Sequence, residues 1–412
     1  MLRRIVFPLT ILLGAPALVG FLWRTVSGAA PRDLVLELWA KPTPQAAATV
    51  AAFLIFELAL WGLLPGRTCA GPLTPSGSRV VYKMNGLAAW AVTHLLLIAA
   101  SFGFHWFSLA GIYHQLGPIL TVCTMLGWAL AVFAYARGRW FASGADAAEH
   151  RGFLYDFAWG VELHPRLFGL DLKHFLITRF GMMSWSVILL VCAARQHERD
   201  GFLSDSLWIA VGLQLLYIVK FFYWESGYLG TLDLSHDRFG FYLAWGSVAW
   251  MPYIYPLSTQ YLVTHRTRLG PAEAAALAMV GAAAILANYS ADRQRQRVRE
   301  TSGRCTVHGK PPALIPATYR TADGRVHQNL LLASGWWGVA RHSNYLMEIV
   351  AALAWTIPCG FAQPAPYTYV LFLTGLLIHR ALRDDERCLR KYGSAWLEYR
   401  GRVPYRIMPG VF

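Results

Sequence analysis

Long uninterrupted blocks of apolar residues, rather than amphipathic repeats, dominate the chain. About 20 consecutive apolar residues suffice for one helical crossing of a bilayer. The pattern therefore predicts an all-α polytopic membrane protein with about ten transmembrane helices. The predicted spans lie near 5–23, 46–65, 86–104, 118–136, 181–194, 205–224, 239–263, 271–288, 345–362 and 366–382.

Positive charges indicate how the chain is oriented in the membrane. Arg3 and Arg4 precede the first span, which has no clear cleavage site, so we expect a retained anchor. The loops 105–117 and 361–366 contain no Lys or Arg, whereas the alternate loops are rich in Arg. The positive-inside rule then places both termini in the cytoplasm, although Arg266 and Arg268 fall on the opposite side of this scheme.

Two polar stretches, 137–180 and 289–344, interrupt the apolar pattern on the predicted cytoplasmic side. In the second, Asp323-Gly324 supplies the turn chemistry of a hairpin between two short extended runs. We expect a small cytosolic cap that includes this hairpin. With no internal repeat and mostly short loops, the chain is interpreted as a single membrane domain over residues 1–412.

Composition excludes several kinds of site. The net charge is +14, but the basic residues border the apolar spans, so no nucleic-acid partner is expected. The six Cys form no CxxC pair, which predicts free thiols, with neither a disulfide framework nor a metal site. No GxGxxG, GxxxxGK[ST], HExxH or GxSxG pattern occurs, so a Rossmann site, P-loop, zincin or serine hydrolase is not supported.

The stretch WGVARHSNYLMEI (337–349) places Arg341, His342, Asn344 and Tyr345 at the start of an apolar span. A helix N-terminus carrying such side chains suits an anion. The alternative is that the aromatic residues, including Trp337, only mark the membrane interface.

Helical spacing brings further polar residues together. Arg380, Asp384 and Cys388 are four residues apart, so the first two can pair where the apolar run is still in progress. Such a pair is expensive in a membrane and favours a functional role over a structural ion pair. Arg295 and Arg299 have the same spacing and suit phosphate, or alternatively anionic lipid.

Aromatic residues crowd the span near 239–263, including Tyr242, Trp245 and Trp250. Aromatic packing explains most of them. A wall of this kind also suits a flat polycyclic ligand.

Three motifs, WGVARHSNY, HRALRDDERCLRKYG and VPYRIMP, resemble the sterol reductase family, which includes the C14 and C24(28) reductases and the sterol domain of the lamin B receptor. The resemblance covers nearly the whole chain. The segments GPLTPSGSRVVYKMNG, SHDRFGFYLAWG and YRTADGRVHQ are similar to the 7-dehydrocholesterol reductase branch in particular. This chain has His164, Ser247, Asp292 and Arg295 where the family pattern has Asn, Asp, Asn and Lys.

The resemblance implies a sterol-side half at 1–260 and an NADPH-binding half at 261–412. We expect Asp384 and Arg380 to form the catalytic polar centre, with Tyr242 as a proton relay. The implied NADPH site comprises Arg295, Arg299, Leu332, Trp337, Asn344, Tyr345, Asp384, Cys388, Tyr392 and Tyr399.

The resulting hypothesis is NADPH-dependent reduction of the C7,C8 double bond of a 5,7-diene sterol, with the sterol and the lipid bilayer as partners. Protonation at C8 leaves an allylic cation, and hydride addition at C7 completes the reduction. The alternatives are a C14 or side-chain sterol reductase, an isoprenylcysteine-type membrane methyltransferase, and a non-catalytic sterol-binding protein. The location is the cytoplasmic membrane if the source is bacterial and the endoplasmic reticulum membrane if it is eukaryotic.

Overall fold

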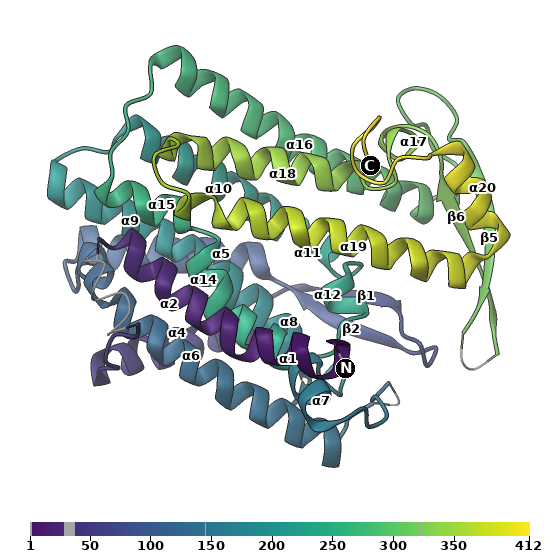
Figure 1. Cartoon of the computed structure of the whole chain (residues 1–412), viewed down its shortest axis with the longest axis horizontal. Coiled ribbons are helices and arrows are strands. Elements are labelled where there is room, and N and C mark those ends of the chain that lie inside the picture. Colours follow the sequence, from purple (N-terminus) through teal and green to yellow (C-terminus); the bar gives the residue numbers. More distant parts are fainter. Residues whose placement is uncertain (1, 29–37, 145, 322–323) are drawn as a thin grey trace. The chain divides into compact units, whose positions relative to one another are not determined.

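The computed structural model describes residues 2–28, 38–144, 146–321 and 324–412, and most of them are helical (Figure 1). Contacts divide the chain into two compact units. Unit 1 comprises 1–72, 79–270 and 358–368, and unit 2 comprises 73–78, 271–357 and 369–412.

Unit 1 is built from long helices, and some of them begin at a side-chain cap. Thr43 accepts a hydrogen bond from the Ala46 amide at 3.1 Å, and Ser108 accepts one from Gly111 at 3.0 Å, which satisfies amides that have no partner inside the helix. The principal helices are α1 (Phe7–Leu9) and α2 (Ala15–Val26) within the continuous helical segment Leu2–Val26, α4 (Pro44–Leu63), α5 (Gly86–Ile98), α6 (Leu109–Trp140), α8 (Leu172–Phe175), α9 (Met183–Asp200) and α10 (Asp205–Tyr223).

Shorter elements complete unit 1. They are α7 (Phe153–Trp159), α11 (Glu225–Tyr228), α12 (Leu232–Ser235), α13 (Phe241–Trp245), α14 (Met251–Ile254) and α15 (Leu257–Thr264), with the two-residue strands β3 (Arg166–Leu167) and β4 (Leu170–Asp171). A further hairpin, β1 (Arg67–Leu73) and β2 (Arg79–Met84), lies in a basic segment that the sequence analysis assigned only to a loop.

Across the parts of the chain that the structure describes, seven helices are long and apolar enough to cross a membrane, and they coincide with seven of the ten predicted spans. The other three predictions fall on helices with a different character. In the region 239–263 the helical segment 241–254 ends before Pro256 and α15 begins after it, because proline cannot donate the helical hydrogen bond. The span near 345–362 contains a helix of only 14 residues, and that near 366–382 belongs to a helix whose second half is strongly charged.

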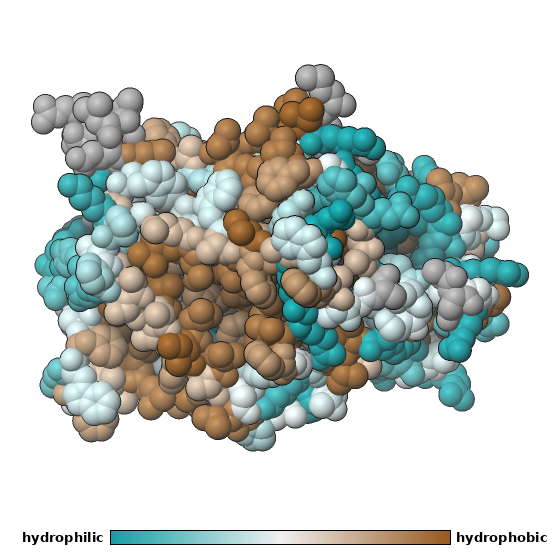
Figure 2. All heavy atoms as spheres, turned by 90° about the horizontal axis from the view of Figure 1, so that it is seen from below, coloured by the Kyte–Doolittle hydropathy of each residue, from teal (hydrophilic) through white to brown (hydrophobic). Residues whose placement is uncertain are grey.

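The surface carries the apolar area expected of a membrane protein. Figure 2 shows a broad patch of hydrophobic side chains on one face. Ile55, Leu95 and Met125 are 59–67% exposed on α4, α5 and α6, whereas 83% of the apolar stretch within Leu172–Asp200 is buried. The outer helices therefore offer their side chains to lipid, and the helix containing α9 forms the interior of unit 1.

Unit 2 combines helices with a hairpin. It contains α16 (Pro271–Glu300), β5 (Leu314–Arg320), β6 (Val326–Leu332), α17 (Trp336–Val339), α18 (Ser343–Thr356), α19 (Thr368–Tyr392) and α20 (Ser394–Arg402). Helix α16 packs along α18 (Figure 1). The strands pair antiparallel from Leu314 opposite Leu332 to Arg320 opposite Val326, which confirms the predicted hairpin. Gly324 has φ +79°, while Asp323 lies outside the described residues.

Candidate functional site

One face of α16 organises the site in unit 2. Asn288, Asp292 and Arg295 are spaced by four and three residues, so they lie on the same side of the helix. The Asn288 amide donates to the Asn344 carbonyl at 2.9 Å, and the Asn344 side-chain amide donates to Asp292 Oδ1 at 3.0 Å. The guanidinium of Arg295 lies 4.0 Å from the centre of the Trp337 ring. The structure thus brings together two predicted binding residues, Trp337 and Asn344, with Asp292 and Arg295, which differ from the family pattern.

The segment around α17 is fixed from two sides. Trp337 donates from its indole to the Ala291 carbonyl at 2.7 Å, and its own carbonyl accepts from the Tyr399 hydroxyl at 3.0 Å. Arg341 donates to the Val403 carbonyl at 2.9 Å. These bonds satisfy buried backbone groups and hold the start of α18 rigidly.

His342 and Tyr345 form a stacked pair at that helix start, with ring centroids 4.7 Å apart and an interplanar angle of 9°. Burial lowers the pKa of His342 to about 4. The imidazole is consequently neutral at pH 7. Its Nε2 lies 3.7 Å from Asp384 Oδ2, which is therefore a contact between a neutral ring and a carboxylate.

Asp384 is held on its own helix. Its carboxylate accepts from Arg387 at 2.5 Å and from the Cys388 thiol at 3.7 Å. Burial favours the neutral acid, but the charge of Arg387, its hydrogen bond and the other nearby charges together hold the pKa of Asp384 below its usual range. Asp384 is thus ionised at neutral pH. Arg380 lies one turn earlier on α19, and its predicted pairing with Asp384 stays a prediction.

Several cationic side chains lie near Tyr392. The hydroxyl of Tyr392 accepts from Asn329 at 2.7 Å, and Lys391 lies 3.7 Å from the Tyr319 ring centre. Burial, followed by the charge of Arg387, lowers the pKa of Lys391 to about 8, and the charge of Arg299 also acts on it. Several cations close together suit phosphate.

Arg299 and Tyr392 were predicted from the sequence, whereas Arg387 and Lys391 were not. The spacing of these two residues from Asp384 and Cys388 along α19 was the available signal.

The remaining predicted binding residues form the walls of two apolar clusters. Leu332 packs with Val298, Val307 and Trp337. Cys388 and Tyr399 belong to a cluster with Ile315, Ala317, Leu331, Trp396 and Val403. The six cysteines are free, as predicted.

Three positions singled out from the sequence lie in unit 1. Tyr242 is on α13, and its ring lies 5.3 Å from that of Trp159. The Ser247 hydroxyl donates to the Leu243 carbonyl at 2.6 Å, within its own helix. His164 Nδ1 lies 3.1 Å from the Tyr82 hydroxyl and 3.3 Å from Asp171 Oδ2.

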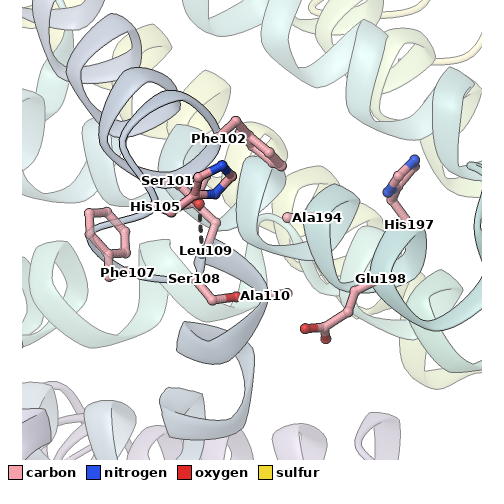
Figure 3. Close-up of a pocket in the computed structure, with 10 residues that line it drawn as sticks. All are labelled: Ser101, Phe102, His105, Phe107, Ser108, Leu109, Ala110, Ala194, His197 and Glu198. Atoms are coloured by element: carbon pink, nitrogen blue, oxygen red, sulfur yellow. Dashed lines mark hydrogen bonds between the residues drawn. The ribbon is translucent and has the colours of Figure 1, made fainter.

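A pocket of about 450 Å³ also lies in unit 1, between residues 101–110 and the end of α9 (Figure 3). His105 and Phe107 line it from one side and His197 and Glu198 from the other. None of the predicted site residues lines this pocket.

Fold and site together define a polytopic helical membrane protein with a polar, cation-rich centre in unit 2. The sequence matches the Ergosterol biosynthesis ERG4/ERG24 family over residues 19–412, and the chain belongs to that family. This family membership supports sterol double-bond reduction rather than the methyltransferase alternative.

Individual relatives point to two activities. The chain is similar to the 7-dehydrocholesterol reductase of Arabidopsis thaliana, with 42% identity over 95% of this chain and 90% of the relative. It is 38% identical to the enzyme of that name from Xenopus laevis, over 88% of this chain and 79% of the relative. It is also 36% identical to the Delta(14)-sterol reductase of Methylotuvimicrobium alcaliphilum, over 98% of this chain and 94% of the relative.

Proposed function

We propose that this protein reduces the C7,C8 double bond of a 5,7-diene sterol with NADPH. The 42% identity to a 7-dehydrocholesterol reductase over 95% of the chain is the observation that supports this bond most directly. The enzyme is embedded in a membrane with both termini on the cytoplasmic side, as the distribution of positive loops favours.

The residues of unit 2 fit NADPH. Arg299, Arg387 and Lys391 offer positive charge to its phosphates, because guanidinium and ammonium groups bind phosphate oxygens. Trp337, stacked on Arg295, offers an aromatic wall. The buried side-chain oxygen Oδ1 of Asn344 accepts no hydrogen bond from the described residues, so it is available to a ligand donor.

Reduction of a ring alkene requires a proton as well as a hydride. Bound NADPH supplies the hydride. Asp384 is ionised at neutral pH, so it acts by balancing the charge of Arg387 and orienting its neighbours rather than as the proton donor. Burial raises the pKa of the Cys388 thiol to about 12 and also raises the pKa of Tyr399, so both keep their protons. In unit 1, Tyr242 remains the proposed proton relay.

The test is incubation of membranes that contain the protein with 7-dehydrocholesterol and NADPH. We expect NADPH-dependent loss of the diene absorbance and a product, identified by mass spectrometry, that carries two additional hydrogens at C7 and C8. An Asp384→Asn variant serves as the inactive control. If the diene of 7-dehydrocholesterol survives in the presence of NADPH, the proposal is contradicted.

Reduction of a C14 double bond is the second candidate, favoured by the 36% identity to a Delta(14)-sterol reductase over 98% of the chain. The same membranes given a C14-unsaturated sterol decide between the two. Preferential loss of the C14 double bond would retain sterol reduction and replace the proposed substrate.

A further inference from the structure

We infer that Asp292 is a positioning residue that fixes the Asn344 amide, so that Asn344 presents an acceptor to a hydrogen-bond donor of the bound cofactor. The inference rests on the proposed NADPH site. It concerns the position where this chain has Asp instead of the Asn of the family pattern.

The hydrogen bond to Asp292 fixes the orientation of the Asn344 side-chain amide. Asn344 Nδ2 donates to Asp292 Oδ1 at 3.0 Å, and an ionised carboxylate can only accept hydrogen bonds. The amide therefore cannot turn its oxygen toward Asp292. Arg295 forms an ion pair with the same carboxylate oxygen, at 3.6 Å. The backbone carbonyl of Asn344 accepts a hydrogen bond from the Asn288 side chain, which holds the backbone in place beneath the Asn344 side chain.

The opposite end of the amide has no partner among the described residues. Asn344 is 7% exposed, and its Oδ1 accepts no hydrogen bond there. A buried acceptor left without a donor costs on the order of 1–3 kcal/mol, which a ligand N–H or O–H can recover. The carboxamide N–H and the ribose hydroxyls are the donors that NADPH offers to such an atom.

Asparagine at position 292 removes this constraint. Its amide can donate or accept, so Asn344 can flip and present an N–H instead of an oxygen. In Asp292→Asn we therefore expect the KM for NADPH to rise about ten-fold while kcat stays within about two-fold, since only a binding contact is affected.

A swap of the two side chains provides the decisive control. In Asp292→Asn/Asn344→Asp, the amide at 292 donates to one oxygen of the carboxylate at 344, which leaves the other oxygen as an acceptor. We expect this double variant to recover a KM within about three-fold of wild type, at unchanged net charge. Asn344→Asp alone faces one carboxylate with another and should bind NADPH less tightly than the double variant.

The outcomes separate this inference from the proposed function. If the wild-type protein reduces no sterol with NADPH, the proposed function fails and the inference falls with it. If wild type is active but Asp292→Asn leaves the KM unchanged, the positioning role is wrong. If both single variants raise the KM and the swap does not restore it, or if kcat alone falls, the role is likewise overturned. Monodisperse protein after detergent extraction confirms that each variant is folded.

Discussion

Asp384 and Asp385, adjacent on α19, hold different partners. Asp384 accepts from Arg387 on its own helix at 2.5 Å. Asp385 accepts from the Trp396 indole at 2.9 Å and from Arg406 at 3.2 Å. One carboxylate therefore belongs to the polar centre of unit 2, and the other secures α20 and the segment after it.

Asp385→Asn should reduce stability. Asp385 is 8% exposed, and Arg341 and Arg400 lie 3.9 Å from it in addition to Arg406, so loss of its charge leaves nearby guanidinium groups uncompensated. We expect a loss on the order of 3 kcal/mol, measured as a lower melting temperature in detergent. Glu386→Gln removes an exposed carboxylate at the next position and should leave the melting temperature unchanged. Equal effects of the two variants would contradict the role of Asp385.

Asp384→Asn should reduce activity instead. The amide cannot balance Arg387 or orient a proton-carrying neighbour such as Cys388, so we expect kcat to fall at least about 100-fold. The melting temperature should change less than in Asp385→Asn. Steady-state turnover and thermal unfolding of both variants provide the comparison, and a variant that retains wild-type turnover would remove Asp384 from the mechanism.

Arg299→Gln tests the phosphate contact. The charge of Arg299 acts on Lys391 and Tyr392, whereas Arg297, two residues away, projects from another face of α16. A hydrogen bond to a charged group contributes about 1.5–3 kcal/mol, so loss of Arg299 should raise the KM for NADPH at least about ten-fold. Arg297→Gln should leave the KM within about two-fold of wild type. If both variants weaken NADPH binding equally, the effect is long-range charge rather than a specific contact.

The sequence predicts the elements of this site better than its contacts. Seven of the ten predicted spans, the β5–β6 hairpin and the shared face of Asp384 and Cys388 follow from local periodicity and turn chemistry, and the structure confirms them. The β1–β2 hairpin was missed because Gly71 and Pro72 interrupt β1 and neither strand alternates apolar and polar residues. The role of Asp385 depends on Trp396 and Arg406, and tertiary contacts of this kind leave no periodic signal in a single sequence.

His342 predicts how stability depends on pH. Burial lowers its pKa to about 4, below the ordinary value of 6.5 in the unfolded chain. Between these values the unfolded state binds the proton more readily, so folding stability is complete above pH 6.5 and declines as the pH falls toward 4.

The shift corresponds to a loss on the order of 3 kcal/mol across that window. His342→Gln should reduce the slope, because glutamine does not titrate, whereas His308→Gln, which removes an exposed imidazole, should retain the wild-type slope. Thermal unfolding in detergent from pH 7 to pH 4 measures all three proteins. Asp384 contributes little to the change in stability between pH 6.5 and pH 4, because its lowered pKa places its titration below that range. An unchanged slope in His342→Gln would show that the imidazole is not held neutral beside the Asp384 carboxylate, and the arrangement of the polar centre would then have to be revised.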